Sequence, residues 1–129
     1  MADPLRILLI EDDTGHARLI QELLKDAVGE NWAIHRACRL EEAFEYARAS
    51  GVDVVLMDLS LPDTSGGDTL DRAKRALPGI PLIVISSNDD PELAVGLRRA
   101  GASGYLVKGR IETSDLVKAI REAVDPPKV

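Results

Sequence analysis

Short β-rich stretches alternate with longer segments along the chain, and this alternation restricts the possible folds more than any other feature. The stretches are Leu5–Ile10, Trp32–Arg36, Val52–Met57, Pro81–Ile85 and Gly104–Val107. Each is long enough for a strand, and each is separated from the next by enough residues for a helix. The pattern therefore predicts a strand followed by a helix, repeated five times.

Three runs within these stretches are interpreted as apolar on both faces, namely Ile7–Ile10, Val52–Met57 and Leu82–Ile85. Central strands of a parallel sheet have this pattern because helices cover both of their faces. Trp32–Arg36 contains polar residues and is predicted to be an edge strand. Right-handed crossovers between such strands give an α/β fold with an open, doubly wound parallel sheet. In such folds ligands bind beyond the carboxyl ends of the strands.

The segments between the strands contain residues that are typical of helix boundaries. Ser65 with Asp68 resembles a capping pair before the third helix. Asp90-Pro91 is typical of the N-cap and first position of a fourth helix. The last helix is predicted to begin around Thr113–Asp115 and to end before Pro126-Pro127.

Length and composition favour one domain over residues 1–129, with its core at about 5–124. Cys38 is the single cysteine, and His16 and His35 are the only histidines. These three residues are too few for a structural zinc site, which needs four cysteine or histidine ligands. The two histidines are expected to be surface residues without a catalytic partner. A net charge of −6 disfavours direct binding to nucleic acid, so any DNA contact is expected to come from a partner.

The sequence lacks the signals of a membrane or secreted protein. Its apolar stretches are far shorter than the roughly 20 residues that a membrane-spanning helix needs. The segment Met1–Pro4 has no basic residues followed by an apolar core, as a secretory signal would. We therefore expect a cytoplasmic protein that does not bind a membrane.

Acidic residues follow two of the predicted central strands. Glu11-Asp12-Asp13 comes directly after the first of them, and Asp58 ends the third. If these strands are neighbours, the carboxylates lie close together, and two charges about 4 Å apart repel by about 4 kcal/mol at an effective dielectric constant of about 20. Such a cluster either takes up a proton or binds a cation, and all-oxygen ligands favour Mg²⁺. Asp13 fits equally well as the cap of the first helix.

The same acids disfavour a nucleotide site, because a fold that cradles phosphates has glycines at this position. The fourth and fifth strands end in a hydroxyl group, Ser86, and an ammonium group, Lys108. With a cation on one side and a lysine on the other, this edge of the sheet could hold a phosphoryl group. Asp58 could be the nucleophile, because a carboxylate that attacks phosphorus forms an aspartyl phosphate.

With these residues the chain resembles the receiver domain of two-component response regulators, including the chemotaxis regulators. The motifs that carry the resemblance are Leu8–Asp13, Val54–Pro62 with Gly66, Val84–Ser87 and Gly101–Lys108. They follow one another in the family's order, and the resemblance extends from Leu5 to Val124. It implies a flavodoxin-like fold with strand order 2-1-3-4-5, the order shared by flavodoxin and the chemotaxis receiver.

The resemblance also implies the chemistry of the site. Asp58 would accept a phosphoryl group from a phosphohistidine of a sensor histidine kinase or a histidine phosphotransfer protein. Asp12, Asp58 and the backbone carbonyl of Ser60 would bind Mg²⁺, with Glu11 reaching the ion through water. Lys108 would pair with the phosphoryl oxygens.

Two further residues are implied in the response to phosphorylation. Ser86 would hydrogen-bond the phosphoryl group, and Tyr105 would move inward into the space that opens. A half-buried aromatic residue on the last strand does not need a switch to explain it, so a purely structural role for Tyr105 stays open as an alternative. A receiver of this kind is not an enzyme for a separate substrate. It assists its own phosphorylation and dephosphorylation and signals to a downstream effector protein or an output domain.

Other interpretations stay open. Gly109 stands where most receivers have a proline, which leaves room for an adaptor that works without phosphorylation. Glu11–Thr14 loosely resembles the acid-x-acid-Thr motif of aspartate-dependent phosphohydrolases, although there is no room for a substrate cap. After Val124 the chain is either a stand-alone regulator or continues through a linker that begins at Pro126-Pro127. A homodimer through the fourth and fifth helices is also open.

Overall fold

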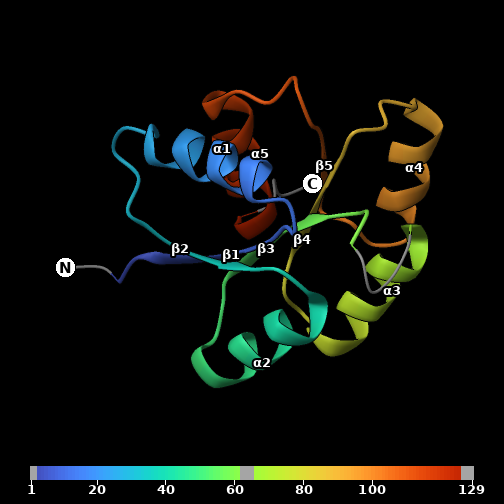
Figure 1. Ribbon diagram of the computed structural model, residues 1–129, viewed down its shortest axis with the longest axis horizontal. Coiled ribbons are helices and arrows are strands. Elements are labelled where there is room, and N and C mark those ends of the chain that lie inside the picture. The colour runs from blue at the N-terminus through green and yellow to red at the C-terminus, as the bar shows by residue number, and fades with distance from the viewer. Residues whose placement is uncertain (1–2, 62–65, 126–129) are drawn as a thin grey trace.

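The computed structural model describes residues 3–61 and 66–125. Strands and helices alternate along the chain: β1 Leu5–Ile10, α1 Thr14–Lys25, β2 Trp32–Ala37, α2 Leu40–Ser50, β3 Val54–Asp58, α3 Gly66–Ala76, β4 Leu82–Ser86, α4 Pro91–Arg99, β5 Gly104–Val107 and α5 Thr113–Val124. All strand pairs are parallel, and the strand order is β2-β1-β3-β4-β5. The predicted fold class is confirmed: a doubly wound, flavodoxin-like sheet of five strands (Figure 1).

The helices cover both faces of the sheet (Figure 1). Helices α1 and α5 pack on one face, where Ile20 and Leu116 belong to the same buried cluster. Helices α2, α3 and α4 cover the other face, where Phe44, Leu70 and Leu97 form a second cluster. Among the described residues, no helix is long and apolar enough to cross a membrane.

The central strand β1 shows why its last four residues, Ile7–Ile10, are all apolar. Ile7 and Leu9 belong to the cluster with α1 and α5, whereas Leu8 and Ile10 belong to the cluster with the other helices. Successive side chains of a strand point to opposite faces, so both sets are buried in this two-sided sheet. All four are at most 1% exposed.

Three strands differ from their predicted bounds by one or two residues. β3 begins at Val54 rather than at residue 52, because the carboxylate of Asp53 accepts the backbone N–H of Arg6 at 2.7 Å in place of a strand carbonyl. Its last residue is Asp58. β4 begins after Pro81, which has no N–H to donate, and β2 extends to Ala37.

Side chains cap the first turns of three helices. Asp13 caps α1 by accepting the backbone N–H of His16, which settles its role as a helix cap. Asp90 caps α4 in the same way, with Pro91 as the first helical residue, as predicted. At α5, Glu112 and Asp115 form a reciprocal capping box. The capping pair expected at Ser65 lies outside the described residues.

Candidate functional site

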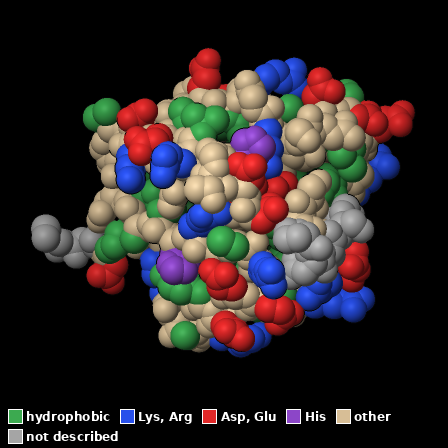
Figure 2. Space-filling view, viewed as in Figure 1, with side chains coloured by type: hydrophobic (Ala, Val, Ile, Leu, Met, Phe, Trp, Pro, Cys, Tyr) green, Lys and Arg blue, Asp and Glu red, His purple; other side chains and the backbone are tan. Residues whose placement is uncertain are grey.

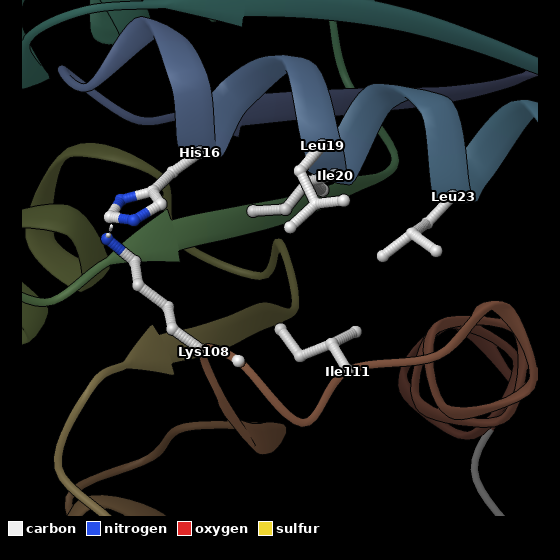
Figure 3. A pocket seen from close by; sticks show the side chains of 7 residues that line it. His16, Leu19, Ile20, Leu23, Lys108 and Ile111 are labelled. Atoms are coloured by element: carbon white, nitrogen blue, oxygen red, sulfur yellow. Dashed lines mark hydrogen bonds between the residues drawn. The ribbon is translucent and has the colours of Figure 1, made fainter.

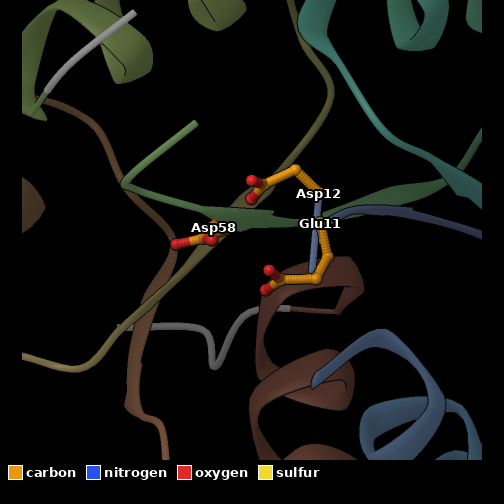
Figure 4. A group of neighbouring side chains, drawn as sticks. All are labelled: Glu11, Asp12 and Asp58. Carbon is orange, nitrogen blue, oxygen red and sulfur yellow. The ribbon is translucent and has the colours of Figure 1, made fainter. Parts of the chain in front are cut away.

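The three predicted acids meet at the carboxyl end of the sheet. β1 and β3 are neighbours with Ile10 opposite Met57, so the residues that follow these two lie side by side. Carboxylate oxygens of Glu11, Asp12 and Asp58 lie within 4.8 Å of one another (Figure 4). Acidic side chains also gather near the middle of the face shown in the space-filling view (Figure 2). We call these three residues the acid cluster.

One ammonium group faces the acid cluster. Lys108 follows β5, and its Nζ lies 3.0 Å from Oε2 of Glu11 and 3.0 Å from Oδ2 of Asp58. Glu11 is 0% exposed and Asp58 is 3% exposed, whereas Asp12 faces solvent. The single ammonium of Lys108 does not balance three carboxylates, so this cluster attracts a further cation.

Burial and charge shift the pKa values of two of these groups. Burial raises the pKa of the Glu11 carboxyl, and the neighbouring charge of Asp58 adds to this effect, while Lys108 opposes it. For Lys108, burial lowers the pKa, but the close carboxylates of Glu11 and Asp58 outweigh it and raise the pKa overall. Lys108 therefore stays a cation beside the acid cluster at neutral pH.

Replacing Glu11 by glutamine is expected to raise the free energy of unfolding of the metal-free protein at neutral pH by about 1 kcal/mol. Because the pKa of Glu11 is raised by burial, the wild type loses stability relative to the variant as the pH rises through this pKa. Below the pKa of a glutamate in the unfolded chain, the difference disappears. Urea unfolding in EDTA between about pH 3.5 and about pH 8 measures this difference in the free energy of unfolding between variant and wild type.

The control for this prediction is Glu22→Gln, on the exposed surface of α1. It is expected to leave the pH dependence of unfolding unchanged. A Glu11→Gln variant that is less stable than the wild type at about pH 8 would contradict the prediction.

The donor set of the acid cluster fits Mg²⁺. Oε2 of Glu11 is buried and has no hydrogen-bond partner among the described residues, so its contact with Lys108 is an ion pair only. Asp12 is open to solvent, where a hydrated ion would enter. Carboxylate oxygens with neighbouring water are the ligands that Mg²⁺ prefers. At Ser60 the N–H donates to Oδ1 of Asp58 at 3.0 Å, and a metal role for the Ser60 carbonyl stays a prediction.

Ser86 and Tyr105 both form hydrogen bonds with the loop between β4 and α4, beside the acid cluster. Ser86 ends β4, is 5% exposed, and its hydroxyl oxygen accepts the backbone N–H of Asn88 at 3.1 Å. The hydroxyl of Tyr105, on β5, donates to the backbone carbonyl of the same Asn88. The loop between β4 and α4 therefore links the two residues that were predicted to act together.

Gly109 shapes the segment that presents Lys108. Its φ of 86° lies in the left-handed region, which glycine adopts freely and which proline cannot reach. A side chain at Gly109 would have open space, so its conformation alone favours glycine. The departure from the receiver pattern does not turn Lys108 away, because its Nζ contacts both Glu11 and Asp58.

His16 lies on the exposed surface of α1, as expected, but its ring contacts Lys108, a predicted site residue. Its Nδ1 lies 3.3 Å from Nζ of Lys108 (Figure 3). The same Nδ1 lies 3.8 Å from Oδ1 of Asp13. His16 and Lys108 stand at one end of a shallow groove between α1 and the segment after β5, lined by Leu19, Ile20, Leu23, Lys108, Gly109 and Ile111. His35, the other histidine, stacks on Tyr46 with ring centroids 3.6 Å apart.

Arg36 was not among the predicted site residues. From β2 its guanidinium donates to the backbone carbonyls of Glu11 at 3.0 Å and Asp12 at 3.2 Å. It therefore holds the start of the loop that carries two members of the acid cluster. A basic residue near the end of an edge strand was the only sequence signal for this contact.

The chain is similar to known proteins over most of its length. The family profile of the response regulator receiver domain matches residues 7–121. The response regulator UvrY of Escherichia coli K12 is 31% identical over 91% of this chain and 53% of its own length. The nitrate/nitrite response regulator protein NarL of the same strain is 32% identical, over 94% of this chain and 55% of NarL.

The relatives are longer than the chain. The methanogenesis regulatory protein FilR1 of Methanothrix harundinacea is 31% identical over 92% of this chain but only 27% of FilR1. The chain therefore spans about half the length of UvrY and NarL, at 53% and 55%, and 27% of FilR1.

Two solved structures have the same fold over nearly their whole length. A response regulator receiver domain protein from Clostridium thermocellum is 28% identical with a TM-score of 0.77, and the match covers 94% of each chain. A CheY-like receiver domain protein from Methanospirillum hungatei is 27% identical with a TM-score of 0.78, covering 95% of each.

Proposed function

Because this chain belongs to the receiver domain family of two-component response regulators, we propose that Asp58 accepts a phosphoryl group from a phosphohistidine. The donor is a sensor histidine kinase or a histidine phosphotransfer protein. The observation that carries the proposal is the environment of Asp58, a 3% exposed carboxylate in the acid cluster with Nζ of Lys108 3.0 Å from its Oδ2. Because Asp58 is the last residue of β3, a phosphoryl donor would approach it at the carboxyl end of the sheet.

In the proposed step, a carboxylate oxygen of Asp58 forms a bond to phosphorus. The bond between phosphorus and one nitrogen of the donor's imidazole breaks, and the electron pair stays on that nitrogen; because the other ring nitrogen carries a proton, the donor leaves as neutral imidazole. Lys108 lies at hydrogen-bond distance from the accepting carboxylate, so its ammonium neutralises charge on the phosphoryl oxygens. Because the protein carries out its own modification, it acts as a phosphoacceptor that assists the transfer.

Glu11, Asp12, Asp58 and the carbonyl of Ser60 are the residues that would hold Mg²⁺. The ion, when bound, supplies further positive charge against the phosphoryl oxygens. The buried Oε2 of Glu11, which has no hydrogen-bond partner among the described residues, supports this assignment.

The response to phosphorylation is proposed to pass through Ser86 and Tyr105. Once Ser86 turns its hydroxyl toward a phosphoryl group, it releases the N–H of Asn88. The carbonyl of Asn88 is the acceptor for Tyr105, so the loop and the tyrosine rearrange together. This biases the surface of α4 and β5 between two arrangements, which an effector protein or an output domain reads.

The test is the intact mass of the protein after incubation with a small acyl phosphate, with and without Mg²⁺. One added phosphoryl group that requires Mg²⁺ supports the proposal. No adduct under either condition, including after trapping of short-lived phosphoaspartate, overturns it and favours the adaptor. The contacts of Lys108 with Glu11 and Asp58 disfavour the adaptor, which has no need of this arrangement.

The groove beside Lys108 is proposed to receive the phosphohistidine donor. Leu19 is 53% exposed on α1, and the groove leads from it along His16 to Lys108 (Figure 3). We expect Leu19→Glu to slow transfer from a histidine phosphotransfer protein by about tenfold, the loss typical of a charged residue in an apolar contact. Transfer from the small acyl phosphate should stay unchanged, because that donor does not need the groove.

The matched control for this variant is Val95→Glu, an equally apolar and exposed residue at 49% on α4. Phosphoryl transfer is followed by the mass of the receiver over time. Equal slowing with both donors would contradict the role of the groove, since a general disturbance of the site affects every donor.

A further inference from the structure

Thr69 is a polar residue within the apolar core. It lies on α3, its side chain is 0% exposed, and its sequence neighbour Leu70 belongs to the buried cluster on that face. Its hydroxyl donates a hydrogen bond of 3.1 Å to the backbone carbonyl of Leu59. Leu59 directly follows Asp58, so this bond ties α3 to the loop that carries the accepting carboxylate.

The peptide group between Leu59 and Ser60 is bound at both ends. Its carbonyl accepts from Thr69, and its N–H, that of Ser60, donates to Oδ1 of Asp58 at 3.0 Å. On its other side, the N–H of Leu59 donates to the carbonyl of Ile85 at 3.0 Å and continues the pairing of β3 with β4. A peptide group held at its carbonyl and its N–H cannot rotate about the chain axis without breaking one of these bonds.

The two oxygens of Asp58 are therefore held by different partners. Oδ1 accepts from the N–H of Ser60, and Oδ2 accepts from Nζ of Lys108. Together these bonds fix the plane of the carboxylate. A nucleophile in phosphoryl transfer has to be aligned with the bond that breaks, so the orientation of this plane affects the rate.

We propose that Thr69 is a positioning residue for phosphoryl transfer, which acts by holding the Leu59–Ser60 peptide so that the Ser60 N–H points at Asp58. This inference rests on the proposed function of Asp58 and adds a residue that lies outside the acid cluster. The hydrogen bond from Thr69 also polarises the peptide and strengthens its N–H as a donor. The carbonyl of Ser60, the proposed metal ligand, belongs to the next peptide and is constrained by the same anchor.

The alternative is that the Thr69 hydroxyl serves stability alone, since buried polar groups are generally hydrogen-bonded in any protein. The chain offers a matched control for this. Thr113 is half-buried at the start of α5, and its hydroxyl donates to the carbonyl of Leu23 at 2.7 Å. It makes the same kind of bond between two elements, but at residues that take no part in the acid cluster.

The experiment compares Thr69→Val, which removes the hydroxyl at nearly constant volume, with Thr69→Ser, which keeps it, and with Thr113→Val. Three quantities are measured at a temperature where each protein is folded: hydrogen exchange of the Ser60 amide without metal, Mg²⁺ affinity by titration calorimetry, and the phosphorylation rate with acyl phosphate. For Thr69→Val we expect about tenfold faster exchange of the Ser60 amide and about tenfold losses in Mg²⁺ affinity and rate, as for other residues that orient metal ligands.

Thr69→Ser should restore all three quantities to within about twofold of the wild type. Thr113→Val should lower stability without changing any of them. If Thr69→Val does not fold, Thr69→Cys replaces it, because a thiol keeps the size but is a weak donor.

Wild-type exchange and rate in folded Thr69→Val or Thr69→Cys, or losses of the same size in Thr113→Val, would overturn the inference. A wild type that takes up no phosphoryl group would overturn the proposed function instead. In that case the Ser60 amide would still decide whether Thr69 holds the peptide, because its exchange is measured without metal or phosphoryl donor.

Discussion

Asp58→Asn is expected to remove the phosphoryl adduct completely, with a fall in the rate of phosphorylation of more than about 10³-fold. The amide of asparagine is a very poor nucleophile compared with a carboxylate. Of the two remaining acids, Glu11 is 0% exposed and held by Lys108, and Asp12 is one of the residues proposed to hold Mg²⁺. The variant should still fold, because asparagine has nearly the same shape and can accept the N–H of Ser60. It also lowers the repulsion within the acid cluster.

The measurement is the intact mass after incubation with acyl phosphate and Mg²⁺. Asp71→Asn is the control, an exposed aspartate on α3 that pairs with Arg75. We expect it to gain one phosphoryl group as the wild type does. An adduct of equal yield in Asp58→Asn would place the acceptor on another residue, and peptide mapping would then locate it.

The acid cluster could be predicted because it depends on features that are local in the sequence. Glu11 and Asp12 are the first two residues after β1, Asp58 is the last residue of β3, and parallel neighbours bring the carboxyl ends of both strands to one edge. Lys108 follows β5 directly, so the topology placed it at the same edge of the sheet, and its long side chain reaches the acids. The bounds of β3 were less accurate, because the side chain of Asp53 replaces a backbone partner of Arg6 at its start.

The residues that sequence reasoning missed are held by contacts between distant segments. Arg36 reaches the loop after β1 from the neighbouring strand, and Thr69 reaches the loop after β3 from within α3. His16 meets Lys108 across 92 positions of the chain. A hydroxyl or guanidinium that binds a backbone carbonyl leaves no pattern in the sequence, because any residue supplies that carbonyl. These contacts depend on how the helices pack on the sheet.

Lys108→Met is expected to change two properties of the site in opposite directions. In the wild type the ammonium lies 3.0 Å from Oε2 of Glu11 and 3.0 Å from Oδ2 of Asp58, so it competes with a metal ion for the same oxygens. Without it, Mg²⁺ should bind about tenfold more tightly, because the repulsion among three carboxylates is no longer offset. The methionine keeps the length of the side chain, which limits any change in packing.

The rate of phosphorylation should fall by about 10²- to 10³-fold in the same variant, the loss typical when one preorganised donor to a developing anion is removed. Lys118→Met, on the exposed surface of α5, is the control and should change neither property. Titration calorimetry gives the Mg²⁺ affinity and intact mass over time gives the rate.

If both properties fell together, Lys108 would support the geometry of the acid cluster. If the rate stayed at the wild-type value, its proposed role toward the phosphoryl oxygens would be wrong. The predicted divergence requires that the ammonium stabilise the charge of the transferred group rather than hold the carboxylates in place.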